Sequence, residues 1–452
     1  MVSKNLHTVV IEKLVPGGLG LGRLTEGMVV LVRYVLPGER VVVREMNRKK
    51  DYVSAILEEI LTPSPDRIKP PCSLYGRCGG CDLQHATYNA QIRLKKEILT
   101  ESLLRTAGSI FSDHAVSIHS VLTSPQEFGY RQRIRLQVNN KGQYGFFRTG
   151  SHVLETVSKC LLANDALNAI LEQLQSNESF TELAKQCTAF ELLFNPGDND
   201  TIILLHFRRK PRPRDSLLAT ELANDIIGLS TILMQVEDYG LYDPLNQSFV
   251  SSPPHLAQTV FIEELQSDLI LTWEAGGFSQ INLAQNKKMI NLVLELIKTG
   301  PLNRILDLYC GYGNFSLPVA QLAREVVGID SQNSAIRSSK LNATLNKTHN
   351  CYFEKKQVVQ GVNDLIDAGK TFDAIILDPP RQGAADIIAM LPDLGAEQII
   401  YISCNPSTLA RDLAILCPKG YELLHLTPID MFPQTHHLES VALLKRTIPQ
   451  TT

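Results

Sequence analysis

The sequence contains no long hydrophobic run. No stretch approaches the ~18 consecutive apolar residues that a membrane-spanning helix requires, and the opening residues, MVSKNLH, lack the apolar core of a signal peptide. We therefore expect a cytoplasmic protein with no membrane partner. Disulfides are rare in that compartment, so the nine cysteines are expected to be free thiols or metal ligands.

A strong net charge is also absent, because the formal charge is only −3. The charges are nevertheless unevenly distributed. Residues 1–150 hold 21 Lys and Arg against 13 Asp and Glu, a balance of +8, whereas residues 151–452 hold 23 against 34, a balance of −11. A basic front half is typical of a surface that meets a polyanion. A solvated surface with uneven charge is the alternative.

At 452 residues the chain is long for one domain, and two or three domains are expected. Residues 1–60 alternate short apolar segments with glycine or charged turns, and they predict strands at 8–11, 28–32, 40–44 and 52–57. The glycines of residues 17–22 resemble a dinucleotide loop, but a strand follows them rather than a helix, so a β-turn or bulge is expected. These patterns predict a five-stranded β-barrel of the OB type.

The rest of the chain divides into a central and a C-terminal part. Prolines between residues 63 and 71 mark a linker, and residues 88–107 carry a helical period of apolar residues. Residues 61–268 are expected to form a central α+β domain. From about residue 278, strands and helices alternate, which predicts a Rossmann-like, parallel doubly wound sheet in a domain at residues 269–452. The predicted fold class is α/β.

Three predicted strands of the C-terminal domain end in polar or reactive residues. The run IIYI is followed by SCNP at residues 403–406, the run AIIL by Asp378 and two prolines, and the run RIL by DLYCGYGN at residues 307–314. An open α/β sheet holds its ligand just outside the carboxyl ends of its strands. A thiol, an acid and a glycine turn should therefore meet on one edge and form an active site.

The glycine turn favours one cofactor class. A further strand ends at Asp330, 23 residues after Asp307, where an acid accepts hydrogen bonds from ribose hydroxyls. The turn lacks the G-x-G-x-x-G order of a pyrophosphate cradle. An acid at its head, Asp307, is expected to repel phosphate and to attract the cationic methionine end of S-adenosylmethionine (SAM). SAM is therefore favoured over NAD.

Cys404 and Glu439 suit methylation of a pyrimidine carbon. Carbon 5 of uracil is a poor nucleophile, but a thiolate that adds to carbon 6 makes it reactive enough to accept a methyl group. A base must then remove the carbon 5 proton before the thiol leaves, and Glu439 is the candidate. The strand-end position of Cys404 favours an exposed thiolate, although most lone cysteines are buried structural thiols. A glutamate before an apolar strand is usually a surface residue.

The turn at Asp378-Pro379-Pro380 also resembles the acid-Pro-Pro-aromatic signature of amino methyltransferases. Arg381 stands in place of the aromatic residue, which argues against methylation of an exocyclic amine. An acid that caps a strand end before a rigid turn is the purely structural alternative.

Cys72, Cys78 and Cys81 lie in a Gly- and Pro-rich loop with the spacing C-x5-C-x2-C. Three cysteines this close in a cytosolic protein indicate ligands of a metal or cluster. The fourth ligand must come from elsewhere, and Cys160 is the nearest cysteine in sequence. Four thiolates suit zinc as well as an iron–sulfur cluster, so the spacing leaves the metal open.

Together these motifs resemble those of the RNA uracil-5 methyltransferases that carry an N-terminal TRAM domain, and among them the bacterial 23S rRNA enzymes. The similarity runs along the whole chain. It covers the barrel at residues 1–60, the cysteine loop with Cys160, FSQIN at 278–282, and the motifs around Asp378, Cys404 and Glu439.

The resemblance implies roles for individual residues. The implied ligands of a [4Fe-4S] cluster are Cys72, Cys78, Cys81 and Cys160. The implied SAM contacts are Gln280, Tyr309, Asn314, Asp330, Gln357 and Asp378, with Cys404 as nucleophile and Glu439 as base. Tyr309 and Asp330 depart from the usual Phe and Glu, but they keep the ring and the acid.

The resemblance also implies a monomeric enzyme that acts on 23S rRNA, with tRNA or a different 23S rRNA uridine as alternatives. An RNA-binding iron–sulfur or zinc protein with a vestigial methyltransferase fold fits part of the sequence, but it would not need both Cys404 and Glu439. An amino methyltransferase would use the Asp378 turn, and Arg381 and Cys404 argue against it. No recognisable base-reading motif identifies the RNA that is modified.

Overall fold

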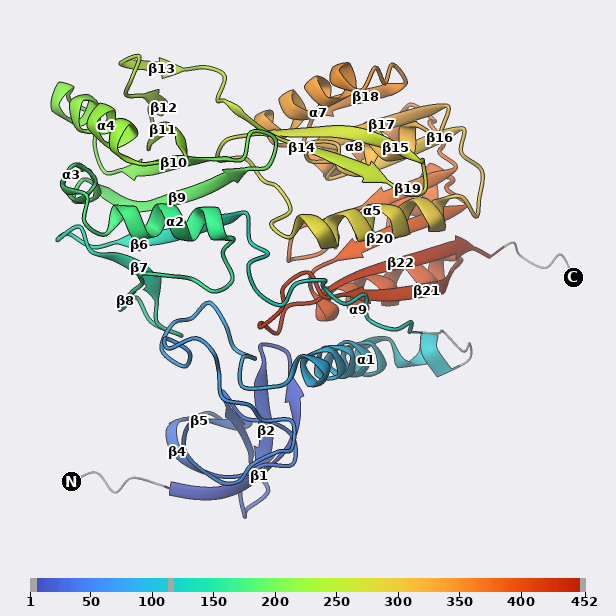
Figure 1. Ribbon diagram of the computed structural model, residues 1–452. Helices are drawn as coiled ribbons and strands as arrows, with labels where there is room; N and C mark the ends of the chain where they lie inside the picture. The colour runs from blue at the N-terminus through green and yellow to red at the C-terminus, as the bar shows by residue number, and fades with distance from the viewer. Residues whose placement is uncertain (1–5, 113–117, 448–452) are drawn as a thin grey trace, which may run out of the picture.

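Four sheets form the framework of the computed structural model, which describes residues 6–112 and 118–447 (Figure 1). They are a closed N-terminal barrel, an eight-stranded central sheet, a two-stranded hairpin and a seven-stranded C-terminal sheet. Within the described ranges, no helix is long and apolar enough to cross a membrane.

The five-stranded barrel that the sequence predicts is present, and it closes in the strand order β1-β2-β3-β5-β4. Its strands are β1 (Leu6–Val15), β2 (Leu19–Arg23), β3 (Val29–Val32), β4 (Arg40–Arg48) and β5 (Tyr52–Thr62). Gly17 and Gly18 have positive φ and make the expected turn. Gly20 lies within β2, where a Cβ atom would come 2.2 Å from Val35 Cγ2. The glycine segment therefore serves the turn and the tight packing of the barrel.

The central sheet has the order β13-β12-β11-β10-β9-β6-β7-β8. Its strands are β6 (Arg133–Val138), β7 (Tyr144–Phe147), β8 (Leu154–Thr156), β9 (Cys187–Asn195), β10 (Asp200–Phe207), β11 (Leu229–Val236), β12 (Gly240–Asp243) and β13 (Ser248–Val250). Helices α2 (Asp165–Leu174), α3 (Glu178–Ala184) and α4 (Pro213–Asp225) share an apolar core with this sheet.

The C-terminal sheet has the order β18-β17-β16-β19-β20-β22-β21. Its strands are β16 (Arg304–Leu308), β17 (Glu325–Asp330), β18 (Cys351–Lys355), β19 (Ala374–Leu377), β20 (Gln398–Ser403), β21 (Tyr421–Ile429) and β22 (Glu439–Arg446). The connecting helices are α5 (Leu283–Ile297), α6 (Ser316–Ala320), α7 (Asn333–Leu345), α8 (Val358–Asp367) and α9 (Pro406–Leu416), with 3-10 turns at Leu391–Leu394 and Cys417–Lys419.

The expectation of a wholly parallel sheet is corrected at one strand. β22 runs antiparallel to both of its neighbours, β20 and β21. The link between β21 and β22 contains no helix, and a parallel pair would need a longer crossover connection. The amino end of β22 therefore lies at the same edge of the sheet as the carboxyl ends of the parallel strands.

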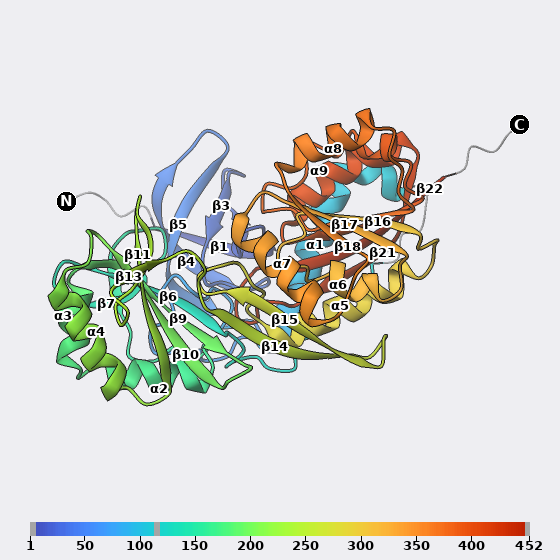
Figure 2. The same cartoon turned by 90° about the horizontal axis from the view of Figure 1, so that it is seen from above.

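Two earlier segments pack on the C-terminal body (Figure 2). Helix α1 (Tyr88–Ser112) contributes Leu99 and Leu103 to an apolar core that includes residues of β19, β20 and α9. The hairpin of β14 (His255–Ile262) and β15 (Ser267–Glu274) packs its inward face with α5. The domain boundary expected between residues 268 and 269 lies inside β15.

A buried ion pair joins α1 to the C-terminal sheet. Lys95 Nζ donates to Asp430 Oδ1 at 2.5 Å and to the Phe432 carbonyl at 3.0 Å, and both charged side chains have no exposed surface. The hydroxyl of Tyr88 donates to the other oxygen of Asp430 at 2.8 Å. Burial lowers the pKa of Lys95, and the adjacent Asp430 opposes that shift.

We expect Lys95→Met to lower the free energy of unfolding by about 3–5 kcal/mol, because it leaves the carboxylate of Asp430 buried without its partner. The control is Arg93→Ala on the same helix, which removes a solvent-exposed pair with Asp66 and should cost no more than about 1 kcal/mol. Urea denaturation followed by circular dichroism measures both. Equal losses in the two variants would contradict the prediction.

Candidate active site

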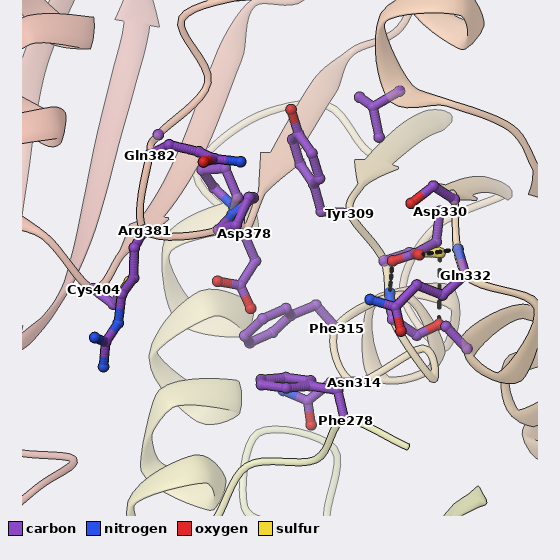
Figure 3. Close-up of a pocket in the computed structure, with 18 of the residues that line it drawn as sticks. Phe278, Tyr309, Asn314, Phe315, Asp330, Gln332, Asp378, Arg381, Gln382 and Cys404 are labelled. Carbon is purple, nitrogen blue, oxygen red and sulfur yellow. Dashed lines mark hydrogen bonds between the residues drawn. The ribbon is translucent and has the colours of Figure 1, made fainter. Parts of the chain in front are cut away.

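A cavity of about 1020 Å³ opens at the carboxyl edge of the C-terminal sheet (Figure 3). It is bounded by the segments that follow β16, β17, β19 and β20 and by the start of β22. All the predicted cofactor and catalytic residues line it: Gln280, Tyr309, Asn314, Asp330, Gln357, Asp378, Cys404 and Glu439. The four predicted cluster ligands lie elsewhere.

The glycine turn after β16 forms one wall of the cavity. Tyr309 has φ of +63°, a left-handed conformation that is unfavourable for a tyrosine. Its N–H donates to the Ile329 carbonyl at 2.9 Å, which fixes the turn against β17. A Cβ atom on Gly311 would meet no protein atom within 4 Å, whereas one on Gly313 would lie 2.2 Å from Leu317 Cδ2. Gly313 is needed for packing, and Gly311 leaves open space that a ligand could occupy.

Asp330 marks one end of the cavity. Its carboxylate accepts hydrogen bonds from the Gly311 N–H at 3.0 Å and from the Gln332 N–H at 2.8 Å. Asp330 and Cys404 lie on opposite sides of the close-up, with Asp378 between them (Figure 3). Asp330, an acid at a position suited to hydrogen bonds with a ribose, and the thiol of Cys404 therefore lie at opposite ends of the same cavity.

Asn314 is held rigidly at the floor of the cavity. Its side chain exchanges two hydrogen bonds with Asn286 of α5, at 2.8 and 2.9 Å, and accepts a third from the Tyr312 hydroxyl at 2.9 Å. Gln357 lies at the N-terminal end of α8 without a side-chain hydrogen bond to that helix, and Gln280 comes from the segment before α5.

The expected direct role of Asp307 is corrected. Asp307 is fully buried and does not line the cavity. It accepts a hydrogen bond from the Ser316 hydroxyl, and burial raises its pKa to about 7. Asp307 lies within β16 rather than after it, and its hydrogen bond to Ser316 joins this strand to the start of α6.

The strand register brings Cys404 and Glu439 together. Ser403 at the end of β20 pairs with Ser440 near the start of β22. Cys404 and Glu439 are the next residues outward on the two strands, and both line the cavity. The carboxylate of Glu439 raises the pKa of the Cys404 thiol, which shows that their charges interact. Glu439 is only 8% exposed, so it is not a surface residue.

The expectation of an exposed thiolate at Cys404 is also corrected. Cys404 is half-buried, and burial, together with Glu439 and Asp378, raises its pKa to about 12. Burial and the charge of Asp378 raise the pKa of Glu439 to about 8, and burial raises that of Asp378 to about 7. In the ligand-free protein, Cys404 is therefore a neutral thiol near pH 7. The guanidinium of Arg381 opposes the shifts of both Cys404 and Glu439.

Several cavity residues were not identified from the sequence as parts of the site. The sequence presents Arg381 only as a departure from an aromatic signature, yet it lines the cavity and its charge acts on both Cys404 and Glu439. His437, whose pKa is lowered to about 4 chiefly by burial, lies two residues before Glu439. Phe278, Phe315 and Phe432 supply aromatic walls. The only signal for these residues was their proximity in sequence to motif residues.

The predicted cluster ligands lie outside this cavity, and some of them affect one another's pKa. Cys160 and Cys72 each raise the pKa of Cys78, and Cys160 and Cys78 raise that of Cys81, which is about 12 chiefly through burial. None of the cysteines forms a disulfide. Within residues 6–112 and 118–447, no group of three or more His, Cys, Asp or Glu side chains is arranged to hold a metal ion.

A buried cation lies beside these thiols. Burial disfavours the charge on Arg131, yet Tyr130, Cys160 and Cys81 together keep its pKa above the usual value. Arg131 Nε is buried and has no hydrogen-bond partner in the described part of the chain. A buried guanidinium nitrogen without a partner, on a cation that interacts with Cys81 and Cys160, fits a site whose ligands carry negative charge.

The fold and the site together define a SAM-dependent methyltransferase. A doubly wound sheet with one antiparallel strand carries a glycine turn after β16, an acid at the end of β17 and a thiol after β20. Residues 87–447 match the tRNA (uracil-5-)-methyltransferase family. The chain belongs to this family and is a SAM-dependent RNA methyltransferase.

Similar proteins cover nearly the whole chain. The 23S rRNA (uracil(1939)-C(5))-methyltransferase RlmD of Pseudomonas fluorescens is 34% identical over 96% of this chain and 91% of that protein. The protein of the same name from Vibrio campbellii is 32% identical over 97% of this chain and 96% of that protein. The tRNA (uracil-54, C5)-methyltransferase of Pyrococcus abyssi, solved with S-adenosyl-L-homocysteine, has a TM-score of 0.72 at 24% identity and covers 96% of this chain and 100% of that one. That structure supports the fold.

Alkylation of Cys404 should be slow at neutral pH, because its pKa is raised to about 12, and should rise about tenfold per pH unit as the thiolate forms. Above pH 8, where Glu439 is ionised, Glu439→Gln should speed alkylation by removing a charge that raises the pKa of Cys404. Peptide mass spectrometry after iodoacetamide treatment measures each cysteine separately.

Cys417 is the internal control for this experiment, because burial raises its pKa to about 11 and Glu439 does not contribute to the shift. Its alkylation rate should be the same in both proteins. Rapid alkylation of Cys404 at pH 7 in the unmodified protein would contradict the description of this residue as a neutral thiol.

Proposed function

We propose that this protein methylates carbon 5 of a uridine in 23S rRNA through a covalent bond between Cys404 and carbon 6. The observation that carries the proposal is the pairing of Ser403 with Ser440, because it sets a thiol and a buried carboxyl side by side at one end of the cavity. The choice of 23S rRNA is supported by the names of the relatives, which are similar to this chain over almost their full length.

In the proposed reaction, Cys404 releases its proton to solvent and attacks carbon 6 of the uracil, which shifts the electron pair of the ring double bond toward carbon 5. SAM would supply the methyl group as an electrophile and leave as S-adenosylhomocysteine. Glu439 then accepts the proton from carbon 5, the ring double bond re-forms, and the bond between carbon 6 and sulfur breaks to release the Cys404 thiolate. Every step is polar and needs no external oxidant or reductant.

The electrostatics of the cavity fit this sequence. Arg381 favours the thiolate form of Cys404, which counteracts the cost of ionising a half-buried thiol. A carboxyl whose pKa is about 8, as for Glu439, is close to the ideal strength for a base at neutral pH. The target base must leave its stack to reach this end of the cavity, at a cost of a few kcal/mol.

The other end of the cavity is proposed as the SAM site. Asp330 would accept hydrogen bonds from the ribose, and Gly311 would leave room for the cofactor beside the backbone. Gln280, Tyr309, Asn314, Gln357 and Asp378 line the space between the two ends. A methyl donor bound there would have its reactive end toward Cys404.

The substrate is tested by mass mapping of 5-methyluridine in rRNA and tRNA from a strain in which the gene is deleted. Loss of one 5-methyluridine from 23S rRNA, restored by the intact gene, is the expected result. A tRNA substrate is the second candidate, because the structurally similar archaeal protein is named as a tRNA enzyme. Loss of a tRNA 5-methyluridine with intact 23S rRNA would favour it.

Cys404→Ala should abolish methylation, because the other cysteine that lines the cavity, Cys310, is buried in the glycine turn near Asp330 and cannot replace it beside Glu439. SAM binding, measured by calorimetry, should stay within about twofold, since the proposed SAM site lies toward Asp330. Cys417→Ala, which changes a cysteine outside the cavity, should keep full activity. Methylation by Cys404→Ala would refute the covalent mechanism.

Glu439→Gln should trap the methylated RNA on Cys404, because glutamine cannot accept the carbon 5 proton. In the unmodified protein, the rate of adduct breakdown should rise with pH up to about 8 and then level off, because Glu439 acts as a base only above its pKa. Denaturing gels with labelled RNA follow the adduct. If the variant still binds RNA but forms no covalent adduct on these gels, the base is another residue.

We further propose that Cys72, Cys78, Cys81 and Cys160 bind a [4Fe-4S] cluster. Two observations support this: the four thiols influence one another electrostatically, and the buried guanidinium of Arg131 lies beside Cys81 and Cys160. Four thiolates also suit zinc, so the choice of a [4Fe-4S] cluster rests on the family resemblance. The proposed role of the cluster is to hold the Gly- and Pro-rich loop in place.

Protein purified without oxygen should be brown and contain iron and sulfide in equal amounts. Cys78→Ala should lose most of the iron and the visible absorbance, whereas Cys417→Ala should keep both. If the anaerobic protein is colourless and contains stoichiometric zinc, the same four cysteines bind zinc and the cluster assignment is wrong.

A further inference from the structure

The segment that leads into Glu439 is held by residues from the opposite end of the chain. This segment, residues 430–438, connects β21 to β22, and we call it the β21–β22 loop. Phe432 and His437 of this loop line the cavity. Gln434 at its centre is buried and has φ of +70°, an unfavourable conformation for a glutamine. A strained loop beside the reactive groups requires contacts that hold it in this shape.

Five hydrogen bonds converge on Gln434, and the longest joins its Nε2 to Glu127 Oε2 at 3.5 Å. The Gln434 carbonyl accepts the N–H groups of Asp82 at 3.2 Å and Leu83 at 3.1 Å, the two residues directly after Cys81. Its N–H donates to Gln91 Oε1 at 2.9 Å, and its side-chain oxygen accepts from Gln91 Nε2 at 3.0 Å. Gln91 is 1% exposed. The residues after the cysteine loop thus bind the backbone carbonyl of Gln434, and the first turn of α1 binds its backbone N–H.

His436 extends this clamp to the cavity. Its Nδ1 is hydrogen-bonded to Asp82 Oδ2 at 2.5 Å, and its ring lies 4.2 Å from the ring of His437. A Cβ atom on Gly18, in the barrel, would lie 3.1 Å from the Cβ of His436. His436 is therefore in contact with the barrel, with the residue that follows the cysteine loop, and with the cavity residue His437.

The first part of the β21–β22 loop has its own anchors. Asp430 is paired with Lys95, its carbonyl accepts from Gln285 Nε2 at 2.9 Å, and the Met431 carbonyl accepts from Asn282 Nδ2 at 3.1 Å. Loss of the contacts at His436 would therefore leave residues 430 and 431 in place. It would change the backbone path of the residues just before Glu439.

We propose that Asp82 and Gln91 position Glu439 for removal of the carbon 5 proton, acting through Gln434 and His436 of the β21–β22 loop. This inference rests on the proposed function, because it assumes that Glu439 is the base. The cysteine loop then serves the chemistry as well as the fold, since the residues that follow Cys81 set the path of the catalytic loop. A proton transfer is sensitive to such alignment: a displacement of about 1 Å costs as much as ~100-fold in rate.

The test compares His436→Ala with His436→Asn. Alanine removes the hydrogen bond to Asp82, whereas the amide nitrogen of asparagine can occupy nearly the position of Nδ1 and donate to the same oxygen. In single turnovers with RNA from the deletion strain, His436→Ala should slow adduct breakdown by about tenfold or more, with SAM affinity and the rate of methyl transfer within about twofold. His436→Asn should recover most of the loss. Gln91→Ala, which acts on Gln434, should give the same kinetic signature.

Tyr34→Phe is the matched control. It removes a hydrogen bond of 2.8 Å to Thr149, which joins the barrel to the turn after β7, next to the cysteine loop. It does not alter the contacts of the β21–β22 loop, so adduct breakdown should be unchanged. Iron content should be equal in all variants, which separates positioning from loss of the cluster.

Adduct breakdown at the normal rate in His436→Ala and Gln91→Ala would refute the positioning role, provided that Glu439→Gln accumulates the adduct. An equal fall in SAM affinity, methyl transfer and adduct breakdown, without recovery in His436→Asn, would also refute it, because that pattern marks a structural contact. Failure of Glu439→Gln to accumulate adduct would instead refute the proposed base, and this inference with it.

Discussion

The antiparallel insertion of β22 beside β20 is the constraint on which the site depends. Because Ser403 pairs with Ser440, the end of one strand and the start of the other meet at the same edge. That edge also receives the carboxyl ends of β16, β17 and β19. Backbone hydrogen bonds therefore bring a thiol and a carboxyl together at the cavity, and a parallel β22 would have placed Glu439 at the opposite edge.

Burial gives these groups their chemical character. Burial raises the pKa of Cys404, Glu439 and Asp378, which share one partly desolvated space. Asp378 adds to the shift of Glu439, and both carboxylates add to that of Cys404, which is therefore a neutral thiol near pH 7. A neutral thiol is protected from adventitious reaction, and a carboxyl with a pKa of about 8 can take up a proton near neutral pH. Arg381, at the same end, is the cation that offsets the cost of forming the thiolate.

The N-terminal segments pack against the C-terminal domain that contains the cavity. Helix α1 contributes apolar side chains to the C-terminal core and the buried Lys95 to the pair with Asp430, while the residues after Cys81 hold Gln434. The barrel approaches the same loop at Gly18. These contacts make the position of Glu439 depend on parts of the chain more than 300 residues away in sequence, as the bond between Gln91 and Gln434 illustrates.

The sequence by itself determined the features that depend on neighbouring residues. Apolar runs that end in Cys404, Asp378 and the glycine turn identified the reactive edge, because strand periodicity and strand ends are local properties. The barrel strands and the cluster of cysteines were recognisable for the same reason. The tertiary structure alone decided the direction of β22, the burial of Asp307, the neutral state of Cys404 and the place of Arg381 and His437 in the cavity. Each of these depends on which distant segments pack together, since strand register, desolvation and charge interactions are set by neighbours in space.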